Sequence, residues 1–179
     1  MTSPAIQRRK AVFSCPWFEI VGKELAGPPA ARETYYSLKT RDYCTVVPVT
    51  PEGRFVLVRQ FRPAVESVTL ELPSGCVEPG EDPAKAMARE LLEETGYAAP
   101  KGMELLGKFH ADSGRLDNTL WAYVAMNVVA RSGARPEPGL EPVVCSAGAL
   151  RRFIRQGTFQ HAPHLGLLAL AAWRGKVRF

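Results

Sequence analysis

The sequence has no apolar segment long enough to cross a membrane. Its longest apolar run extends from Leu165 to Trp173, about half of the ~18 residues that a membrane-spanning helix requires. The basic residues near the N-terminus, Arg8 to Lys10, precede a short stretch that is interrupted by Pro16 and Glu19 and lacks a small-residue cleavage pattern. We therefore expect no membrane partner, no secretory leader and a cytoplasmic location.

Paired cysteines are absent as well. The four cysteines, Cys15, Cys44, Cys76 and Cys145, are widely separated and form no CxxC pair. Disulfide frameworks and structural zinc sites need clustered cysteines, so isolated buried thiols in a reducing compartment are the expected arrangement.

Acidic residues are fewer than basic ones: the chain has 18 Asp and Glu against 23 Lys and Arg, which gives a net charge of +5. A positive charge favours polyanionic partners in general. The basic residues are nevertheless dispersed apart from Arg8–Lys10 and Arg151–Arg152, and no zinc-finger spacing or RNP-type aromatic motif occurs. We therefore expect no nucleic-acid partner, and a small molecule that carries phosphate suits this charge equally well.

The length and composition predict one globular domain with a small appended element. The chain has 179 residues, against about 150 for a typical domain, and 46% of its residues are hydrophobic and 23% charged, as in an ordinary globular protein. We place the boundary after residue 42, so that residues 1–42 form a small β-rich N-terminal element and residues 43–179 form the main domain.

Strands are expected along most of the chain, and helices in three places. β-branched and alternating patterns predict the strands, and the segments at residues 26–29 and 50–53, rich in Pro and Gly, predict turns. The expected strands cover residues 12–21, 33–38, 43–49, 54–60, 68–72, 104–110 and 120–129, and two helices cover residues 147–156 and 163–173. Strands mixed with a few helices, without strict βαβ alternation, predict an α+β fold in layers.

The clearest helix begins at Pro83 and ends before Gly96. Asp82 stands at the N-cap, Pro83 occupies the first helical position, where its missing N–H costs nothing, and Gly96 suits a left-handed C-cap. Apolar side chains recur at spacings of three and four, so one face of the helix packs inward: Ala84, Met87, Ala88, Leu91, Leu92 and Thr95.

Three carboxylates share a stripe beside that apolar face, because Glu90, Glu93 and Glu94 stand at i, i+3 and i+4. Each like-charged pair costs about 0.2–0.5 kcal/mol in an isolated helix, and a cation bound between them relieves the repulsion. Arg89, four residues before Glu93, is placed to pair with its carboxylate. Taken alone, the three glutamates are also compatible with a solvated acidic face.

The residues around this helix resemble the Nudix box, whose pattern is G-x5-E-x7-R-E-U-x-E-E-x-G-U, where U is apolar. Residues 75–97 meet all of its fixed positions, and only Tyr97 departs from the usual aliphatic residue at the end. The matching residues are Gly75, Glu81, Arg89, Glu90, Glu93, Glu94 and Gly96. Such a match arises by chance in about one sequence in a million at ordinary residue frequencies. The resemblance implies a Nudix α/β/α sandwich with a mixed sheet, and a hydrolase that cleaves diphosphates.

The sequence that precedes the box resembles the ADP-ribose pyrophosphatase branch of this family. Residues 59–62, RQFR, match its RQ[YF]R strand end, and residues 71–75, ELPSG, match its E-[LF]-P-[AS]-G lead-in. The resemblance implies cleavage of ADP-ribose or a related nucleoside diphosphate sugar to a nucleoside monophosphate and a sugar phosphate. It also implies a homodimer in which the N-terminal strands, within residues 1–42, exchange between protomers and help to form the substrate site.

The resemblance further implies which residues hold a metal. The backbone carbonyl of Ser74 and the carboxylates of Glu90 and Glu94 are the implied ligands, and Glu93 is a further ligand or positions the attacking water. Mg²⁺ suits such an oxygen-rich set, and Mn²⁺ is an alternative.

Three arginines are candidate substrate ligands. By the resemblance Arg62, together with Arg59, faces the diphosphate, a role that suits the planar guanidinium; a strand-end salt bridge is the alternative for both. Arg115 lies in residues 112–118, DSGRLDN, where relatives often carry a Ser-Pro-Gly loop. This departure leaves the preferred sugar nucleotide open, and Arg115 is either a phosphate or sugar ligand or a surface residue.

The catalytic base has more than one candidate. Relatives often take it from a glutamate in the loop before the penultimate helix, where this chain offers Glu137 and Glu141. We favour Glu141, because the Pro-Val-Val that follows it matches the expected strand, and Glu93 is the other candidate for a catalytic role.

Other functions remain open at this point. The box binds a diphosphate and does not select the groups at its two ends, so a dinucleoside polyphosphate, a nucleoside triphosphate or a GDP-sugar is the alternative substrate. A non-catalytic nucleotide-sugar sensor is less favoured, because the full carboxylate set is retained.

The aromatic and histidine residues have two interpretations each. The nucleobase of the substrate would stack on Trp17, Tyr35 or Tyr36, which are otherwise core residues. The three histidines belong to no ligand pattern and are expected to be structural or surface residues: His110, His161 and His164.

Overall fold

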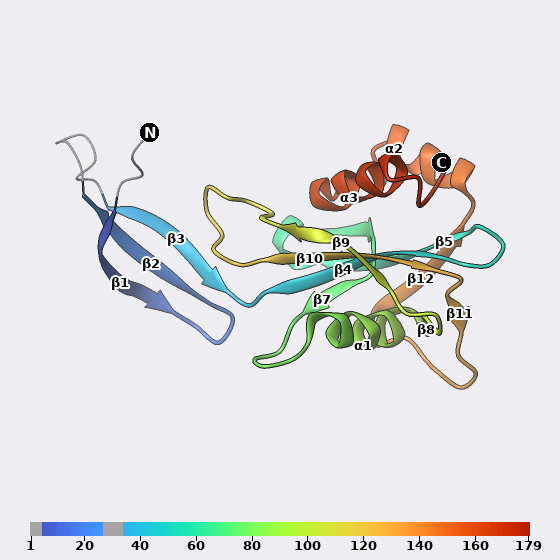
Figure 1. The fold of residues 1–179 in the computed structure, drawn as a ribbon, viewed down its shortest axis with the longest axis horizontal. Helices are drawn as coiled ribbons and strands as arrows, with labels where there is room; N and C mark the ends of the chain where they lie inside the picture. The colour runs from blue at the N-terminus through green and yellow to red at the C-terminus, as the bar shows by residue number, and fades with distance from the viewer. Residues whose placement is uncertain (1–4, 27–33) are drawn as a thin grey trace. The chain divides into compact units, whose positions relative to one another are not determined.

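The computed structural model describes residues 5–26 and 34–179 (Figure 1). The turn expected at residues 26–29 lies almost wholly outside these residues. Contacts divide the chain into two compact units, which are described separately: residues 1–42 together with 110–119, and residues 43–109 together with 120–179. The Nudix-like motif lies in the second unit, which therefore positions the candidate site.

The first unit contains a three-stranded antiparallel sheet in the order β1–β2–β3. Its strands are β1 (Ile6–Ser14), β2 (Phe18–Leu25) and β3 (Tyr35–Thr40). The single strand expected over residues 12–21 is wrong, because the chain turns after Ser14 and the N–H of Cys15 donates to the Phe18 carbonyl at 3.0 Å. Pro16 lies in this turn; it fixes its own φ and has no N–H to give to a sheet.

The second unit is built on a seven-stranded mixed sheet. The strand order is β12–β5–β4–β10–β9, with β6 paired to β5 and β7 paired to β4, and β10 runs parallel to β4. The strands are β4 (Tyr43–Val49), β5 (Phe55–Arg62), β6 (Ser67–Glu71), β7 (Ser74–Cys76), β9 (Glu104–Phe109), β10 (Leu120–Met126) and β12 (Leu140–Cys145). A short 3₁₀ helix, η2 (Pro63–Val65), joins β5 to β6.

One expected strand in this unit is too long. The pattern at residues 120–129 predicts a continuous strand, but β10 ends at Met126 because Asn127 adopts a left-handed backbone with φ of 61°. The chain then forms β11 (Val129–Ala130), which pairs with β8 (Tyr97–Ala98) in a separate two-stranded ribbon.

Helices cover both faces of the seven-stranded sheet, as Figure 1 shows: α1 (Pro83–Thr95) lies on one face, and α2 (Ala147–Arg155) and α3 (Ala162–Trp173) lie on the other. Successive side chains of a strand alternate between these two layers. In β4 and the helices, one core contains Cys44, Val46, Met87 and Leu91, and the other contains Val47, Val49, Leu150 and Leu168. The predicted α+β class and the α/β/α sandwich with a mixed sheet are confirmed. No helix of the described residues is long and apolar enough to span a bilayer.

Candidate active site

Helix α1 begins and ends where its sequence requires. The Asp82 carboxylate accepts the backbone N–H groups of Ala84 and Lys85 at 3.0 and 3.1 Å, which satisfies two of the donors that a helix N-terminus leaves free. Gly96 closes the helix with φ of 73°, and its N–H donates to the Leu92 carbonyl. The helix therefore presents the three carboxylates of its last two turns along one side.

Strand β7 passes so close to α1 that a side chain at residue 75 would displace the carboxylate of Glu90. A Cβ atom on Gly75 would lie 1.9 Å from the carboxylate carbon of Glu90, and 2.2 and 2.3 Å from its oxygens. The Glu90 carboxylate thus lies directly against the backbone of β7. The spacing between this glycine and this glutamate has a steric reason, because the missing side chain of one makes room for the other.

Glu94 is the most buried of the three carboxylates. It is 6% exposed, and its Oε2 atom accepts the backbone N–H of Ser74 at 2.8 Å. Burial raises the pKa of Glu94 to about 8, against the opposing effect of that hydrogen bond. Burial likewise raises the pKa of Glu90. A cation bound between these two groups would offset the free-energy cost of ionising them away from water.

Arg89 connects the helix to the loop before it. Its Nε and Nη2 atoms donate to Glu81 at 3.2 and 3.1 Å, and its Nη1 atom donates to Glu90 at 2.8 Å and to Glu93 at 3.0 Å. Nη2 also donates to the Cys76 carbonyl at 3.2 Å. The predicted pair of Arg89 and Glu93 is confirmed, and the wider network fixes the side-chain orientations of the carboxylate row.

The donor set of this row fits a hard divalent cation. It comprises the three carboxylates of α1 and the main chain of β7 beside them, so its donors are oxygens. Oxygen sets suit Mg²⁺ or Mn²⁺ better than zinc or copper. The structure therefore brings together the four residues predicted as metal ligands: Ser74, Glu90, Glu93 and Glu94.

Arg62 is held next to this cluster by an ion pair with Glu71. Its Nε and Nη2 atoms donate to the two oxygens of Glu71 at 2.9 and 2.8 Å, and the Thr69 hydroxyl donates to the same carboxylate at 2.6 Å. Burial of Glu71, which is 1% exposed, acts to raise its pKa, but the bonds from Arg62 and Thr69 together hold that pKa at about 2. The charges of Arg62 and Glu71 both act on the pKa of Glu94, so the pair adjoins the carboxylate row.

Arg59, predicted to face the diphosphate, and Glu141, predicted as the catalytic base, are paired with each other. They are opposite residues of β5 and β12, and Arg59 Nη1 donates to the two Glu141 oxygens at 2.8 and 2.9 Å. The other loop glutamate contacts α1, because the N–H of Glu137 donates to the Glu93 carbonyl at 2.9 Å and its charge raises the pKa of Glu90.

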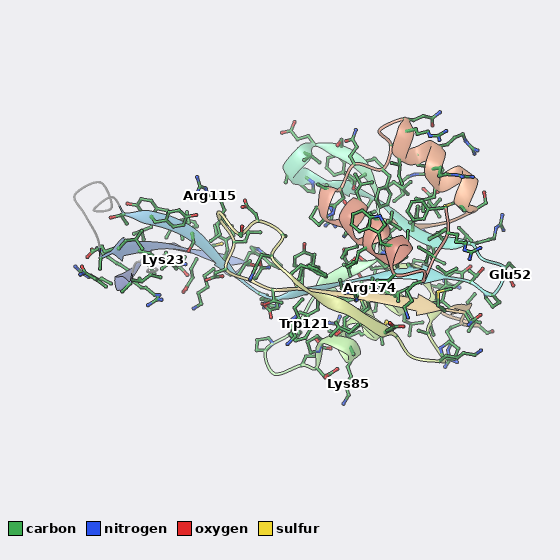
Figure 2. The ribbon with its side chains drawn as sticks, turned by 45° about the horizontal axis from the view of Figure 1, so that its top comes forward. Lys23, Glu52, Lys85, Arg115, Trp121 and Arg174 are labelled. Atoms are coloured by element: carbon green, nitrogen blue, oxygen red, sulfur yellow. The ribbon has the colours of Figure 1, made fainter. Side chains whose placement is uncertain are left out.

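Arg115 belongs to the first unit and helps to line a pocket there. Its guanidinium lies 5.8 Å from the centre of the Tyr35 ring, and the Tyr35 hydroxyl donates to the Gly114 carbonyl. The pocket has a volume of about 440 Å³ and is lined by Ile20, Thr34, Tyr35, Tyr36, Ser37, Leu38 and Arg115. Figure 2 shows Arg115 on the loop that runs beside β3. An aromatic ring beside a guanidinium suits a flat ligand that carries negative charge.

Three residues without a predicted functional role gather beside Arg62. A ring nitrogen of His161, a ring nitrogen of His164 and an oxygen of Glu71 lie within 4.8 Å of one another. The two imidazole rings are stacked, with centroids 3.8 Å apart. Both histidines stand at the start of α3, far from Glu71 in the sequence, so no local spacing could have linked them. The sequence signal for this cluster was Glu71 alone, because it begins the ELPSG segment that matches the family's lead-in to the box.

Comparison with known proteins agrees with this geometry. The family model described as NUDIX domain matches residues 39–154, well over half of the chain. The chain belongs to the NUDIX family.

Several curated proteins are relatives of this NUDIX chain. ADP-ribose pyrophosphatase of Bacillus subtilis (strain 168) is 30% identical over 117 residues, which cover 65% of this chain and 63% of that protein. The methanol dehydrogenase activator of Bacillus methanolicus is 38% identical over 89 residues, covering 50% and 48%. ADP-sugar pyrophosphatase of Mus musculus is 46% identical over 63 residues, covering 33% and 29%. The chain thus spans less than two thirds of the length of each of these relatives.

A solved structure supports the fold. The crystal structure described as ADP compounds hydrolase superposes with a TM-score of 0.83 at 23% sequence identity, over 99% of this chain and 98% of that one. The predicted resemblance to the Nudix family and its ADP-ribose pyrophosphatase branch is confirmed.

Proposed function

We propose that this NUDIX protein is a Mg²⁺-dependent pyrophosphohydrolase that cleaves the diphosphate of ADP-ribose or a related nucleoside diphosphate sugar. The products are a nucleoside monophosphate and a sugar phosphate. The observation that carries the proposal is the placement of half-buried Glu90 against Gly75 and of buried Glu94 against Ser74, with the charge of Arg62 acting on Glu94. The relatives named ADP-ribose pyrophosphatase and ADP-sugar pyrophosphatase support the substrate class.

The carboxylates of Glu90, Glu93 and Glu94 and the backbone carbonyl of Ser74 are the proposed metal ligands, with Mn²⁺ as an alternative ion. When bound, Mg²⁺ neutralises diphosphate charge and lowers the pKa of a coordinated water. The chain itself supplies the alignment of the ligands, because Arg89 bonds both Glu90 and Glu93. A preset row of oxygens need not reorganise when the substrate arrives.

Arg62 and Arg59 are the proposed ligands of the diphosphate. Arg62 is already oriented by Glu71, whereas Arg59 bonds Glu141. If Arg59 turns to a phosphate oxygen, the Glu141 carboxylate loses its partner and becomes free to accept a proton from the attacking water. Arg115, in the first unit, stays a predicted substrate ligand.

The proton acceptor is proposed to be Glu141 or Glu93, with Glu137 as the third candidate. The variants Glu93→Gln, Glu137→Gln and Glu141→Gln separate these roles. Removing the base lowers kcat by on the order of 10²–10⁴-fold, and a glutamate that only supports the loop changes kcat far less.

A substrate panel tests the activity first. The panel contains ADP-ribose, GDP-mannose, UDP-glucose, diadenosine polyphosphates and nucleoside triphosphates, each with Mg²⁺ and with a chelator, and phosphate-coupled turnover is measured. We expect Mg²⁺-dependent cleavage confined to nucleotide sugars. Cleavage of polyphosphates alone would contradict the proposed substrate, and tight binding of ADP-ribose without turnover would identify a sensor.

The variant Glu94→Gln tests the metal site. Glutamine keeps an acceptor for the Ser74 N–H but carries no charge for a cation, so we expect kcat/KM to fall on the order of 10³-fold while circular dichroism and the unfolding midpoint stay unchanged. Glu104→Gln is the matched control, because that side chain is exposed and bonds Lys176. Unchanged turnover in Glu94→Gln would contradict the assignment of Glu94 as a metal ligand.

We further propose a homodimer formed through the N-terminal element, residues 1–42, in the cytoplasm. Its sheet exposes large apolar side chains, since Phe13, Trp17 and Tyr36 are 51, 76 and 53% exposed, and such exposure favours an interface. Four free cysteines accord with a reducing compartment. Light scattering at micromolar concentration is expected to give the mass of two chains, and the mass of one chain would refute the dimer.

A further inference from the structure

We infer that Glu71, His161 and His164 act together as positioning residues, which hold the guanidinium of Arg62 in the orientation that receives the diphosphate. The inference rests on the proposed function, because it takes Arg62 as the diphosphate ligand. It concerns side chains of β6 and α3 that are not part of the metal-binding carboxylate row.

The ion pair leaves a defined part of Arg62 free. A guanidinium has five N–H groups, and Glu71 accepts one from Nε and one from Nη2 at 2.9 and 2.8 Å. The other N–H groups remain for phosphate oxygens. The Arg62 side chain is 41% exposed and that of Glu71 only 2%, so a buried carboxylate anchors a group that solvent and ligands reach. Two parallel hydrogen bonds fix the plane of the guanidinium, which a single bond does not.

The two histidines pack against the carboxylate end of this pair. His164 is fully buried, and its Nδ1 atom accepts the N–H of Leu72, the residue after Glu71, at 3.1 Å. His161 is stacked on His164, and a ring nitrogen of each lies within 4.8 Å of a Glu71 oxygen. The rings therefore shield Glu71 from water. A hydrogen-bonded charge pair in such surroundings is stronger and tolerates less displacement than a solvated one.

The bond from Leu72 also sets the tautomer of His164. Because Nδ1 accepts that hydrogen bond, the proton of the neutral ring is on Nε2, and burial keeps the ring neutral by lowering the pKa of His164 to about 3. Within the described part of the chain, His164 Nε2 has no hydrogen-bond partner. The Glu71 charge acts on this ring, so the neutral imidazole packs beside Glu71 without adding a second charge to its pair with Arg62.

The same three side chains form a cluster of the kind that binds transition metals, but their contacts argue against that use. Both oxygens of Glu71 already accept hydrogen bonds from Arg62, whereas Glu90 and Glu93 each give Arg89 only one oxygen. His164 offers a metal only Nε2, which carries the ring proton while Nδ1 is bonded to Leu72.

Double-mutant cycles on the nucleotide sugar that the wild type cleaves test the inference. Glu71→Gln keeps the shape but not the charge, and His164→Asn keeps an acceptor for the Leu72 N–H but removes the Nε2 donor. In the wild-type background we expect KM to rise about tenfold for Glu71→Gln and about threefold for His164→Asn, with kcat within about twofold. In the Arg62→Lys background each change is expected to alter KM less than about twofold, because the group that they position is gone.

A second measurement does not depend on activity. The Nε–H of Arg62, assigned by its loss in Arg62→Lys, is followed by NMR and is expected to exchange slowly with water in the wild type and at least about tenfold faster in Glu71→Gln and His164→Asn. If His164→Asn does not fold, His161→Gln, at the less buried ring, replaces it in both measurements. His110→Asn is the control, because that histidine is exposed, and it should change neither result.

Two outcomes would overturn the inference. One is an equal effect on KM in both Arg62 backgrounds, or a loss of folded protein and kcat with KM unchanged, because a purely structural role does not depend on Arg62. The other is stoichiometric zinc binding by the wild type that His161→Gln abolishes. If the wild type cleaves no nucleotide sugar, the proposed function fails separately, and the exchange of the Arg62 proton still decides whether these residues hold the guanidinium.

Discussion

At the scale of single residues, the candidate site depends on a glycine as much as on its acids. In Gly75→Ala the new Cβ atom would lie 1.9 Å from the carboxylate carbon of Glu90, so the carboxylate must move away from β7. We expect metal affinity or activity to fall about 10–100-fold. Turnover measured as a function of Mg²⁺ concentration checks this, and the required concentration should rise.

Gly166→Ala is the matched control for that substitution. Gly166 lies within α3, and nothing lies within 4 Å of a Cβ atom built on it. Alanine there should stabilise the fold by about 0.5–1 kcal/mol, because glycine is costly within a helix, and should leave Mg²⁺-dependent turnover unchanged. If Gly75→Ala behaves like this control, the Glu90 carboxylate is not a metal ligand.

The sequence allowed prediction of those site residues that are near one another in the chain. Glu90, Glu93 and Glu94 lie together because one helix carries them, so their spacing alone predicts the carboxylate row. The pairing of Arg59 with Glu141 depends on the β5–β12 register, and no local pattern specifies that register. The meeting of Glu71 with the two α3 histidines depends on how the helix packs on the sheet, so it could not be read from spacing.

At the scale of elements, the N-cap of α1 should contribute measurably to stability. In Asp82→Ala two backbone N–H groups lose their acceptor, and we expect the free energy of unfolding to fall by about 1 kcal/mol. Urea unfolding measures this change. Ser146→Ala removes a longer, single bond of 3.3 Å at the N-cap of α2 and is expected to cost less. An Asp82→Ala variant as stable as the wild type would show that solvent replaces the cap at no cost.

The same elements show why some boundaries were predictable and others were not. The limits of α1 are local, because Asp82, Pro83 and Gly96 each act on the adjoining backbone, and the structure places them as predicted. The strands expected at residues 12–21 and 120–129 are interrupted at Pro16 and Asn127. The proline is visible in the sequence and by itself favours a break in the strand, whereas the left-handed backbone of Asn127 depends on its tertiary contacts.

At the scale of the whole molecule, the layered α/β/α arrangement was predictable from the motif, but the strand order was not. Strands β4 and β10 are distant in the sequence and lie side by side, and β6 and β7, separated only by Leu72 and Pro73, pair with different neighbours. Such pairings are non-local and gain their free energy only after long loops have closed. Hydrophobic periodicity identifies strands but contains no information about their order.

The buried histidines should make the unfolding of the whole molecule depend on pH. Burial lowers the pKa of His164 from 6.5 to about 3, and it lowers the pKa of the stacked His161 as well. His161 and His164 bind protons more weakly in the folded chain than in the unfolded chain, so their contribution to stability falls as the pH falls below 6.5. Glu94 and Glu90 act in the opposite sense, because burial raises their pKa values and they bind protons more tightly in the folded chain. For His164 alone the loss at pH 5 is about 2 kcal/mol. Glu71, with its pKa held at about 2 by Arg62 and Thr69, adds to the loss only below about pH 4.5.

Urea unfolding at pH 7 and pH 5, with a chelator present so that metal binding does not contribute, measures the summed change, and comparison with His164→Asn isolates the part that is due to His164. This variant removes the titrating ring while keeping an acceptor for the Leu72 N–H, so relative to the wild type it should be less stable at pH 7 and should recover part of that deficit at pH 5. His110→Asn, at an exposed histidine, should keep the wild-type difference. If His164→Asn shows the same change in the free energy of unfolding between pH 7 and pH 5 as the wild type, His164 does not contribute to the pH dependence. Other carboxylates or histidines then account for it.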